Sequence, residues 1–306
     1  MSQVTGRTQK SAPCPKHSAD FTPEHFPQSD RHGRTRHLDA AGKDANLGPM
    51  FPIRDHNPSG RVPFVTYALM LTNFAIFVAT WDLAQSPRAL YAFYAEYALV
   101  PAFLMEGYGW QGLVTSMFLH GGLMHIAGNM LFLFIFGDNL EDELGHLGFT
   151  LFYLACGIGA GLIHVISGPY STVPTVGASG AIAGVMGGYL LLFPKARVDI
   201  LLILIVIFKI IPVPAWLMLA LWFGMQLLGG WSTAPDEGGV AYWAHIGGFV
   251  AGLILTVPVW LKRGGPAFWN RTRGQPPHPV ARYDRSHIPR VRKARSTTQV
   301  PRVPRR

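Results

Sequence analysis

Long uncharged segments dominate the middle of this sequence. Val62 to Trp81 is a run of twenty residues without a charge, and comparable apolar segments recur as far as Leu261. In an α-helix, about twenty residues at 1.5 Å each cross the roughly 30 Å hydrocarbon core of a lipid bilayer. A soluble globule has no place for several such segments, so we expect an integral membrane protein.

The positive charges lie mainly at the two ends of the chain. Nine of the 26 Lys and Arg fall in residues 1–62 and thirteen in residues 262–306, which leaves four for the two hundred residues between them. We therefore predict a disordered cytoplasmic tail at 1–61, a membrane domain at 62–261 and a basic, disordered cytoplasmic tail at 262–306. Such tails favour contact with anionic lipid headgroups. Nucleic acid is not an expected partner, because no base-reading motif accompanies the charge.

No metal, cofactor or disulfide is expected. The histidines of the N-terminal tail are irregularly spaced, and Cys14 and Cys156 lie in different environments, one in the polar tail and one inside an apolar run. Metal sites and disulfide frameworks have more regular spacings. The first sixty residues are polar, so the first apolar segment is expected to act as the membrane-insertion signal.

We predict an all-α polytopic fold, a bundle of six transmembrane helices with both termini in the cytoplasm. Residues 82–119 mix aromatic and charged residues, which favours a long loop with short interfacial helices. Residues 198–211 are interrupted by Lys209 and are expected to form a hairpin or an interfacial segment on the cytoplasmic side, where Lys195 and Arg197 also fall. The predicted helices are Val62–Trp81, His120–Phe136, Phe149–Ile166, Gly177–Phe193, Pro212–Gly230 and Val240–Leu261.

The most informative motif is Thr175–Gly184, in which Ser179 stands between glycines at the start of an apolar segment. Most serines in membrane helices only pack or bond to the backbone. Here Gly177 and Gly180 clear the space around the hydroxyl group. The glycines continue along one face at a spacing of four residues, which lets another helix approach to backbone contact. These glycines are Gly180, Gly184 and Gly188, and the last helix offers Gly248 and Gly252.

His245, near the start of the last predicted helix, is the expected partner of Ser179. A histidine inside a membrane helix is costly and usually functional. A neutral imidazole can take the proton of a serine hydroxyl, which makes an activated nucleophile. No carboxylate is an obvious third member, so we predict a dyad. His125 and Asn129, four residues apart on one helical face, and the Ser179 backbone N–H are the predicted donors to an oxyanion.

The dyad also sets the number of spans. Ser179 and His245 each lie near the N-terminal end of a helix, so they can meet at one depth only if both helices run in the same direction. A single span must then separate them, which is why Pro212–Gly230 is predicted as one helix.

Motifs of three other kinds of site are excluded. There is no Gly-x-Ser-x-Gly elbow of an α/β-hydrolase and no His-Glu-x-x-His of a zinc protease, and the Gly-x-Gly-x-x-Gly at Gly107–Gly112 follows no predicted strand, as a dinucleotide-binding motif would.

Taken together, these motifs resemble those of the rhomboid intramembrane serine proteases of the bacterial type. The matching stretches are Gly177–Gly180, Ala244–Gly248 with Gly252, and His120–Asn129, in three helices in the family's order. One departure is Ala183, which stands where some members have a tyrosine that stacks on the catalytic histidine. Tyr242 and Trp243 are the candidates to replace it.

The resemblance implies a function and a role for each matching residue. Ser179 would be the nucleophile, His245 the general base, and His125 and Asn129 the oxyanion donors. The site would lie in a water-filled cavity below the outer surface of a bacterial inner membrane, and the substrates would be single-pass transmembrane proteins. No cofactor is implied. Supporting roles would fall to His120, Gly177, Gly180, Gly248 and Gly252.

Two other classes of function remain as alternatives. A rhomboid-like protein can bind membrane clients without cutting them, but such proteins lose the serine or the histidine, and this chain has both. Intramembrane histidines also occur in transporters. A transporter would show two matched broken segments, whereas the sequence has one, around Pro212 and Pro214.

Overall fold

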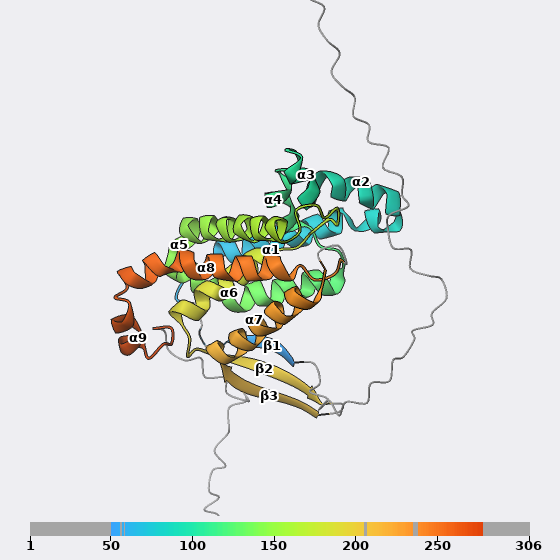
Figure 1. The fold of residues 1–306 in the computed structure, drawn as a ribbon. Helices are drawn as coiled ribbons and strands as arrows, with labels where there is room; N and C mark the ends of the chain where they lie inside the picture. The colour runs from blue at the N-terminus through green and yellow to red at the C-terminus, as the bar shows by residue number, and fades with distance from the viewer. Residues whose placement is uncertain (1–49, 56, 58, 205–206, 235–237, 278–306) are drawn as a thin grey trace, which may run out of the picture. The chain divides into compact units, whose positions relative to one another are not determined.

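The computed structural model describes residues 50–55, 57, 59–204, 207–234 and 238–277, which belong to one compact unit (Figure 1). Most of the two predicted tails, residues 1–49 and 278–306, lies outside the described residues. The described part is mostly helical. Its elements are β1 (Met50–Asp55), α1 (Phe64–Ala79), η2 (Trp81–Gln85), α2 (Pro87–Tyr97), α3 (Pro101–Met105), α4 (Gly112–Thr115), η3 (Ser116–Phe118), α5 (Leu123–Ser167), α6 (Ser179–Leu192), β2 (Arg197–Leu204), β3 (Ile207–Pro214), α7 (Ala215–Ser232), α8 (Tyr242–Lys262) and α9 (Pro266–Thr272).

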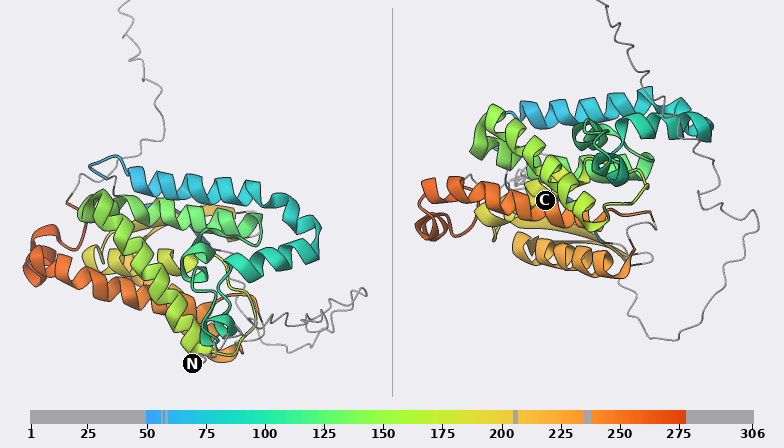
Figure 2. Two further views of the ribbon diagram at one scale, coloured as in Figure 1. Left: turned by 90° about the horizontal axis from the view of Figure 1, so that it is seen from above. Right: turned by 45° about the horizontal axis from the view of Figure 1, so that its top comes forward.

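The helix α5 contains two of the predicted helices. Gly145 has φ 72° and ψ 164°, which interrupts the helix between the segments predicted as His120–Phe136 and Phe149–Ile166. A side chain would be strained at this positive φ, so glycine is the residue that permits the bend. The left view of Figure 2 shows the two arms of α5 meeting at an angle. The second arm therefore turns back to pack beside α6 and α8.

The centre of the bundle is α6, in which eleven of fourteen residues are buried. It packs against α8 with backbone touching backbone, as the glycine spacing predicted. An ideal Cβ atom on Gly248 would overlap the carbonyl of Gly180, and one on Gly252 would overlap the backbone of Gly184. Gly180 meets Gly248, and Gly184, four residues later in α6, meets Gly252, four residues later in α8. The two helices therefore run in the same direction.

The prediction of an all-α fold is wrong for one part of the chain. Three antiparallel strands form a sheet in the order β1-β2-β3, and the described residues of the segment 198–211, which are 198–204 and 207–211, pair with each other in β2 and β3. Val198 and Ile200, two residues apart on β2, are both buried in the core cluster, a position that suits β-branched side chains. Pro212 and Pro214 lie in β3, an edge strand, where a missing backbone donor is tolerated.

The described helices and strands extend beyond residues 62–261 at both ends. Residues 50–55, assigned to a disordered tail, form β1 because they complete the sheet by pairing with β2. At the other end α9 follows α8, with Phe268 buried and the Trp269 indole N–H donating to the Leu191 carbonyl at 2.9 Å. The other predicted spans differ from α1, α6, α7 and α8 by a few residues at their ends, and short helices occupy residues 82–119, as predicted.

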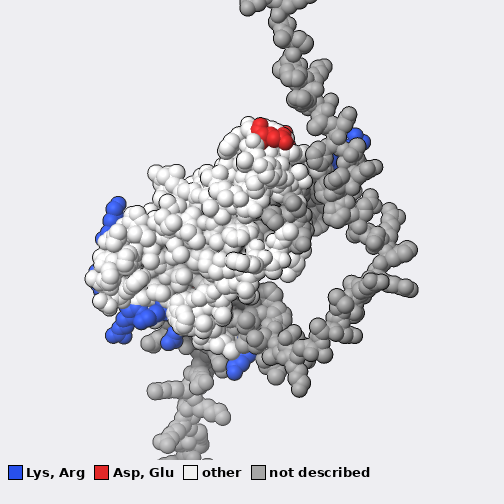
Figure 3. Space-filling model, in the orientation of Figure 1, with Lys and Arg blue, Asp and Glu red and all other residues white. Residues whose placement is uncertain are grey.

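Charged side chains lie at the margins of the visible face. In Figure 3, Lys and Arg lie along the left and lower edges, on the side of α9 and the sheet, with a further basic group at the upper right, and a group of acidic side chains lies at the top, over the region of α3.

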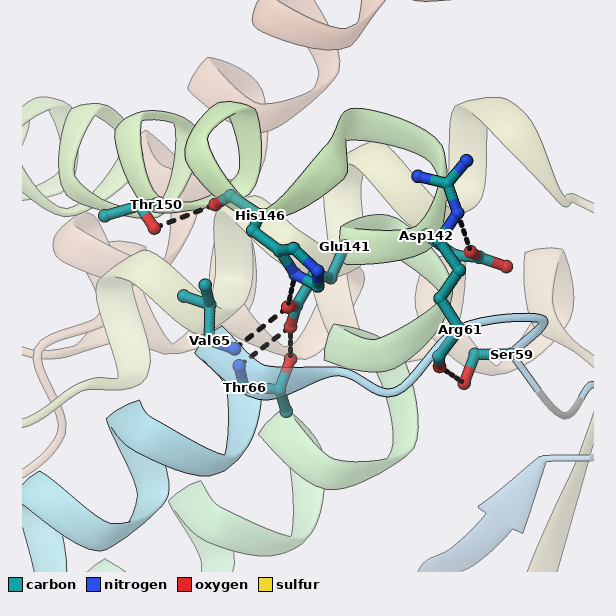
Figure 4. A network of polar contacts seen from close by, with 8 residues as sticks. All are labelled: Ser59, Arg61, Val65, Thr66, Glu141, Asp142, His146 and Thr150. Carbon is teal, nitrogen blue, oxygen red and sulfur yellow. Dashed lines mark hydrogen bonds and ion pairs between the residues drawn. The ribbon is translucent and has the colours of Figure 1, made fainter.

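The first helix, α1, begins at a buried carboxylate. Glu141 is 2% exposed and accepts hydrogen bonds from the backbone N–H groups of Val65 and Thr66, at 2.9 and 2.8 Å, and from the Thr66 hydroxyl at 2.7 Å. The carboxylate oxygen that accepts from Val65, Glu141 Oε1, also lies 2.6 Å from His146 Nδ1 (Figure 4). A carboxylate at a helix N-terminus satisfies free N–H groups and complements the helix dipole. Glu141 therefore joins α1 to the bend of α5.

Two helices of the described residues, α5 and α8, are long and apolar enough to cross a membrane, and α1 and α6 are shorter apolar helices. Large apolar side chains point outward from several helices: Leu71 of α1 is 69% exposed, Leu228 of α7 is 73% exposed and Ile254 of α8 is 63% exposed. Exposed apolar surface on this scale is typical of a surface that meets lipid.

Candidate active site

The serine of the motif lies at the first residue of α6. Gly177 approaches it with φ 132°, a conformation that side-chain-bearing residues rarely adopt, and donates its N–H to the Ser116 carbonyl at 2.9 Å. An ideal Cβ on Gly177 would lie 2.7 Å from His125 Nε2 and 3.6 Å from Ser179 Oγ. Glycine is therefore needed here both for the turn and for the close approach of the imidazole.

The structure brings His245 to Ser179. His245 lies in the first turn of α8, and its Nε2 is 2.7 Å from Ser179 Oγ. At this distance the hydroxyl can donate a hydrogen bond to the imidazole. The parallel arrangement of α6 and α8, with α7 as the one helix between them in the chain, places the two N-terminal ends together as the sequence argument required.

His125 and Asn129 lie on the first arm of α5 and line the same cavity as Ser179. The Gly121 N–H donates to His125 Nδ1 at 3.4 Å. Asn129 is 8% exposed, and nothing among the described residues accepts a hydrogen bond from its Nδ2. A buried donor without an acceptor costs free energy, and native proteins have few of them. This amide is therefore available to a group that enters the cavity.

The predicted supporting residue His120 precedes α5. Because it lies outside the helix, its position is not limited by helical periodicity, and its ring lies 5.1 Å from the His125 ring at 66°. His120 is buried, at 7% exposure. It packs edge to face against His125 and so limits where that imidazole can lie.

The cavity has a volume of about 550 Å³. Polar side chains from α5, α6 and α8 face it together with apolar side chains from α5, α6 and α7, and the segments 173–176 and 238–243 complete its wall. His164 of α5 also lines the cavity and contacts the Thr175 hydroxyl through Nε2 at 2.8 Å. The apolar residues that line the cavity include Phe132, Ile182, Met186 and Trp222.

Two residues of α7 that the sequence argument did not single out contact His245. Gln226 Oε1 is 2.8 Å from His245 Nδ1, and the Trp222 ring lies 5.8 Å from the imidazole at 36°. Of the two candidates for the missing stacking partner, Tyr242 packs against Gly229 and Trp243 donates its indole N–H to the Gly230 carbonyl. Gln226 could have been identified from the sequence, because it is a polar residue in the middle of an apolar helix.

A mostly helical protein whose parallel helices bring a serine and a histidine together at the wall of a cavity has the geometry of a serine hydrolase site on a membrane-protein scaffold. A family model described as the rhomboid domain matches residues 107–262 of the chain. The chain belongs to the rhomboid family. Rhomboid family proteins are integral membrane proteins, and the exposed apolar faces of α1, α7 and α8 agree with this.

Relatives come from plants, fungi and bacteria. RHOMBOID-like protein 5 of Arabidopsis thaliana is 30% identical over 173 residues, which are 54% of this chain and 48% of that protein. Rhomboid protein 1, mitochondrial, of Saccharomyces cerevisiae is 30% identical over 199 residues, 62% of this chain and 51% of that protein. Rhomboid protease GluP of Bacillus subtilis is 32% identical over 168 residues, 53% of this chain and 28% of that protein. The chain thus spans about half or less of these relatives' length.

Proposed function

We propose that this protein is an intramembrane serine endopeptidase that cleaves single-pass transmembrane proteins within or near the membrane. The observation that carries the proposal is the 2.7 Å contact between Ser179 Oγ and His245 Nε2 at the wall of a cavity of about 550 Å³. Family membership supports it, since a bacterial relative is named a rhomboid protease. No cofactor is required for this chemistry.

The proposed reaction has two stages. The Ser179 oxygen attacks the scissile carbonyl carbon while its proton passes to His245 Nε2, and the imidazolium then protonates the leaving amine as the peptide bond breaks. Water, deprotonated by His245, hydrolyses the resulting acyl-enzyme and restores the serine. The substrate helix must unwind first, because a continuous helix holds its amide groups in backbone hydrogen bonds.

The tetrahedral intermediate needs hydrogen-bond donors for its negative oxygen. We assign this role to His125, to the Asn129 Nδ2 group, which has no acceptor among the described residues, and to the Ser179 backbone N–H at the N-terminus of α6. The N-terminus of a helix favours negative charge. Losing one such donor typically lowers kcat by about a hundred- to a thousandfold.

We also propose that α1, the two arms of α5, α6, α7 and α8 form six membrane spans, with both termini in the cytoplasm and the cell's inner (plasma) membrane as the location. Lys195, Arg197 and Trp216, which line a groove near the sheet, would then meet lipid headgroups on the cytoplasmic side. The basic tails would make the same kind of contact with anionic headgroups.

The test is reconstitution of the purified protein in liposomes with a single-pass transmembrane substrate. Wild type should cleave the substrate in the presence of a metal chelator, and Ser179→Ala and His245→Ala should both abolish cleavage while keeping the wild-type thermal midpoint. Persistent cleavage by Ser179→Ala would rule out this nucleophile. A wild-type protein that captures substrate without cutting it, and whose Ser179 does not react with a fluorophosphonate, would instead be a client-binding protein.

A further inference from the structure

The neutral side-chain amide of Gln226 contacts the His245 imidazole at Nδ1, whereas Ser179 contacts it at Nε2. Gln226 is 7% exposed, and it is the polar residue that α7 places in an otherwise apolar stretch, Ala215–Gly230. Its Oε1 lies 2.8 Å from His245 Nδ1. A glutamine inside a membrane helix must have its polar atoms paired, so its partners can be used to work out its orientation.

A backbone carbonyl determines which way the amide faces. Gln226 Nε2 is 3.3 Å from the Trp222 carbonyl oxygen, one helical turn earlier on α7. A carbonyl can only accept a hydrogen bond, so the NH₂ end of the amide must face Trp222 and the oxygen must face His245. Rotating the amide by 180° would set its oxygen against the carbonyl oxygen and its NH₂ group against His245.

The orientation of the amide in turn determines the tautomer of the imidazole. Because Gln226 presents an acceptor to Nδ1, that nitrogen must carry the proton of the neutral ring. Nε2 is then left with its lone pair, and it is Nε2 that lies 2.7 Å from Ser179 Oγ. The other tautomer would set two acceptors, Nδ1 and Gln226 Oε1, against each other, and its Nε2–H would donate to the Ser179 oxygen instead of accepting the hydroxyl proton.

We propose that Gln226 is the positioning residue of this site, the third member of a Ser179–His245–Gln226 arrangement in which an amide replaces the usual carboxylate. This inference rests on the proposed function. Gln226 holds His245 with Nε2 ready to accept the Ser179 proton. When that proton arrives, Nδ1–H keeps donating to the amide oxygen, and the hydrogen bond becomes stronger because its donor is now charged. No proton passes to the glutamine.

The second contact of α7 fixes the plane of the imidazole. The Trp222 ring lies 5.8 Å from the His245 ring at 36° and also packs 6.0 Å from the Phe249 ring of α8. Ala183 of α6 offers no ring to the histidine. One turn of α7 therefore supplies an apolar wall for the imidazole and, through the carbonyl of Trp222, the anchor for Gln226.

The test compares Gln226→Met, which keeps the length of the side chain but lacks the acceptor, with Gln226→Glu, which keeps an acceptor and adds a charge. Met225→Leu, at an exposed neighbour on α7, is the matched control. The readouts in liposomes are kcat, KM and the pH profile of kcat for a fluorogenic transmembrane substrate, the rate of Ser179 labelling by a fluorophosphonate, and the thermal midpoint.

We expect Gln226→Met to lower kcat and the labelling rate about ten- to a hundredfold with KM within about twofold of wild type, as the loss of one hydrogen bond to a charged group predicts. Gln226→Glu should recover most of kcat. The acid limb of its kcat–pH profile should move to higher pH, because a carboxylate stabilises the protonated imidazole. Met225→Leu should match wild type.

Wild-type kcat and pH profile in Gln226→Met would overturn the inference. If that variant does not fold, Gln226→Glu decides: an unshifted acid limb in an active, folded Glu variant has the same meaning. These failures differ from a failure of the proposed function, in which wild type itself neither cleaves nor labels at Ser179; that result would overturn both.

Discussion

Replacing Gly248 by alanine should separate the catalytic pair without touching either member. Gly248 lies three residues after His245, and the group that its Cβ would meet belongs to Gly180, one residue after Ser179. The added carbon would overlap the Gly180 carbonyl oxygen and lie 2.9 Å from the carbonyl carbon. Ordinary carbon contacts are about 3.5–4.0 Å. Because the obstacle is backbone, α6 and α8 must move apart at this depth.

The required shift is about 1 Å, and it would act directly on the Ser179–His245 contact. From 2.7 Å, the Oγ to Nε2 distance would lengthen to the point at which the hydrogen bond is lost, beyond about 3.5 Å. A misplacement of about 1 Å can cost about a hundredfold in rate. Overpacking should also lower the free energy of unfolding by about 1–3 kcal/mol. We therefore expect a large loss of kcat with a moderate loss of stability.

The assay is cleavage of a transmembrane substrate in liposomes together with a thermal midpoint in the same lipid. Gly224→Ala on α7 is the control, because a Cβ at Gly224 has no neighbour within 4 Å. This control should keep the wild-type kcat, since the added methyl group has room. A folded Gly248→Ala protein with the wild-type kcat would refute the view that backbone contact between α6 and α8 places the dyad.

Three further predictions concern other parts of the structure. Glu141→Ala should lower the free energy of unfolding by about 1–3 kcal/mol for each buried donor that it leaves without an acceptor, at the N-terminus of α1; an unchanged thermal midpoint would contradict this. Burial and, secondly, the charge of Asp138 raise the pKa of Asp55 from 3.8 to about 7. The folded state then holds this proton more tightly than the unfolded state, so stability should fall as pH rises from about 4 to 7, and Asp55→Asn should make that slope shallower in thermal scans at several pH values. Asn129→Ala should lower kcat about a hundredfold with little change in KM or thermal midpoint; an equal fall in stability would point to a structural role instead.

Much of the fold could be predicted because lipid imposes strong local rules on a sequence. A long apolar segment must be helical in a bilayer, so the positions of α1, α6, α7 and α8 followed from the absence of charge. The glycine spacing on α6 and α8 predicted their close approach. The hairpin β2–β3 remained one of two possibilities, because a segment of fourteen residues that is apolar except for Asp199 and Lys209 satisfies either structure.

The apolar helices, and the positions of Ser179 and His245 near the N-terminal ends of two of them, follow from local sequence, because both depend on residues close together in the chain. The pairing of β1 with β2 depends on the folded chain, since β1 needs a partner about 150 residues away to form its hydrogen bonds. The same holds for Gln226 and His245, which are 19 residues apart in the chain and 2.8 Å apart in space. Helical periodicity says which face of α7 a residue lies on, whereas the packing of α7 against α8 decides what that face meets.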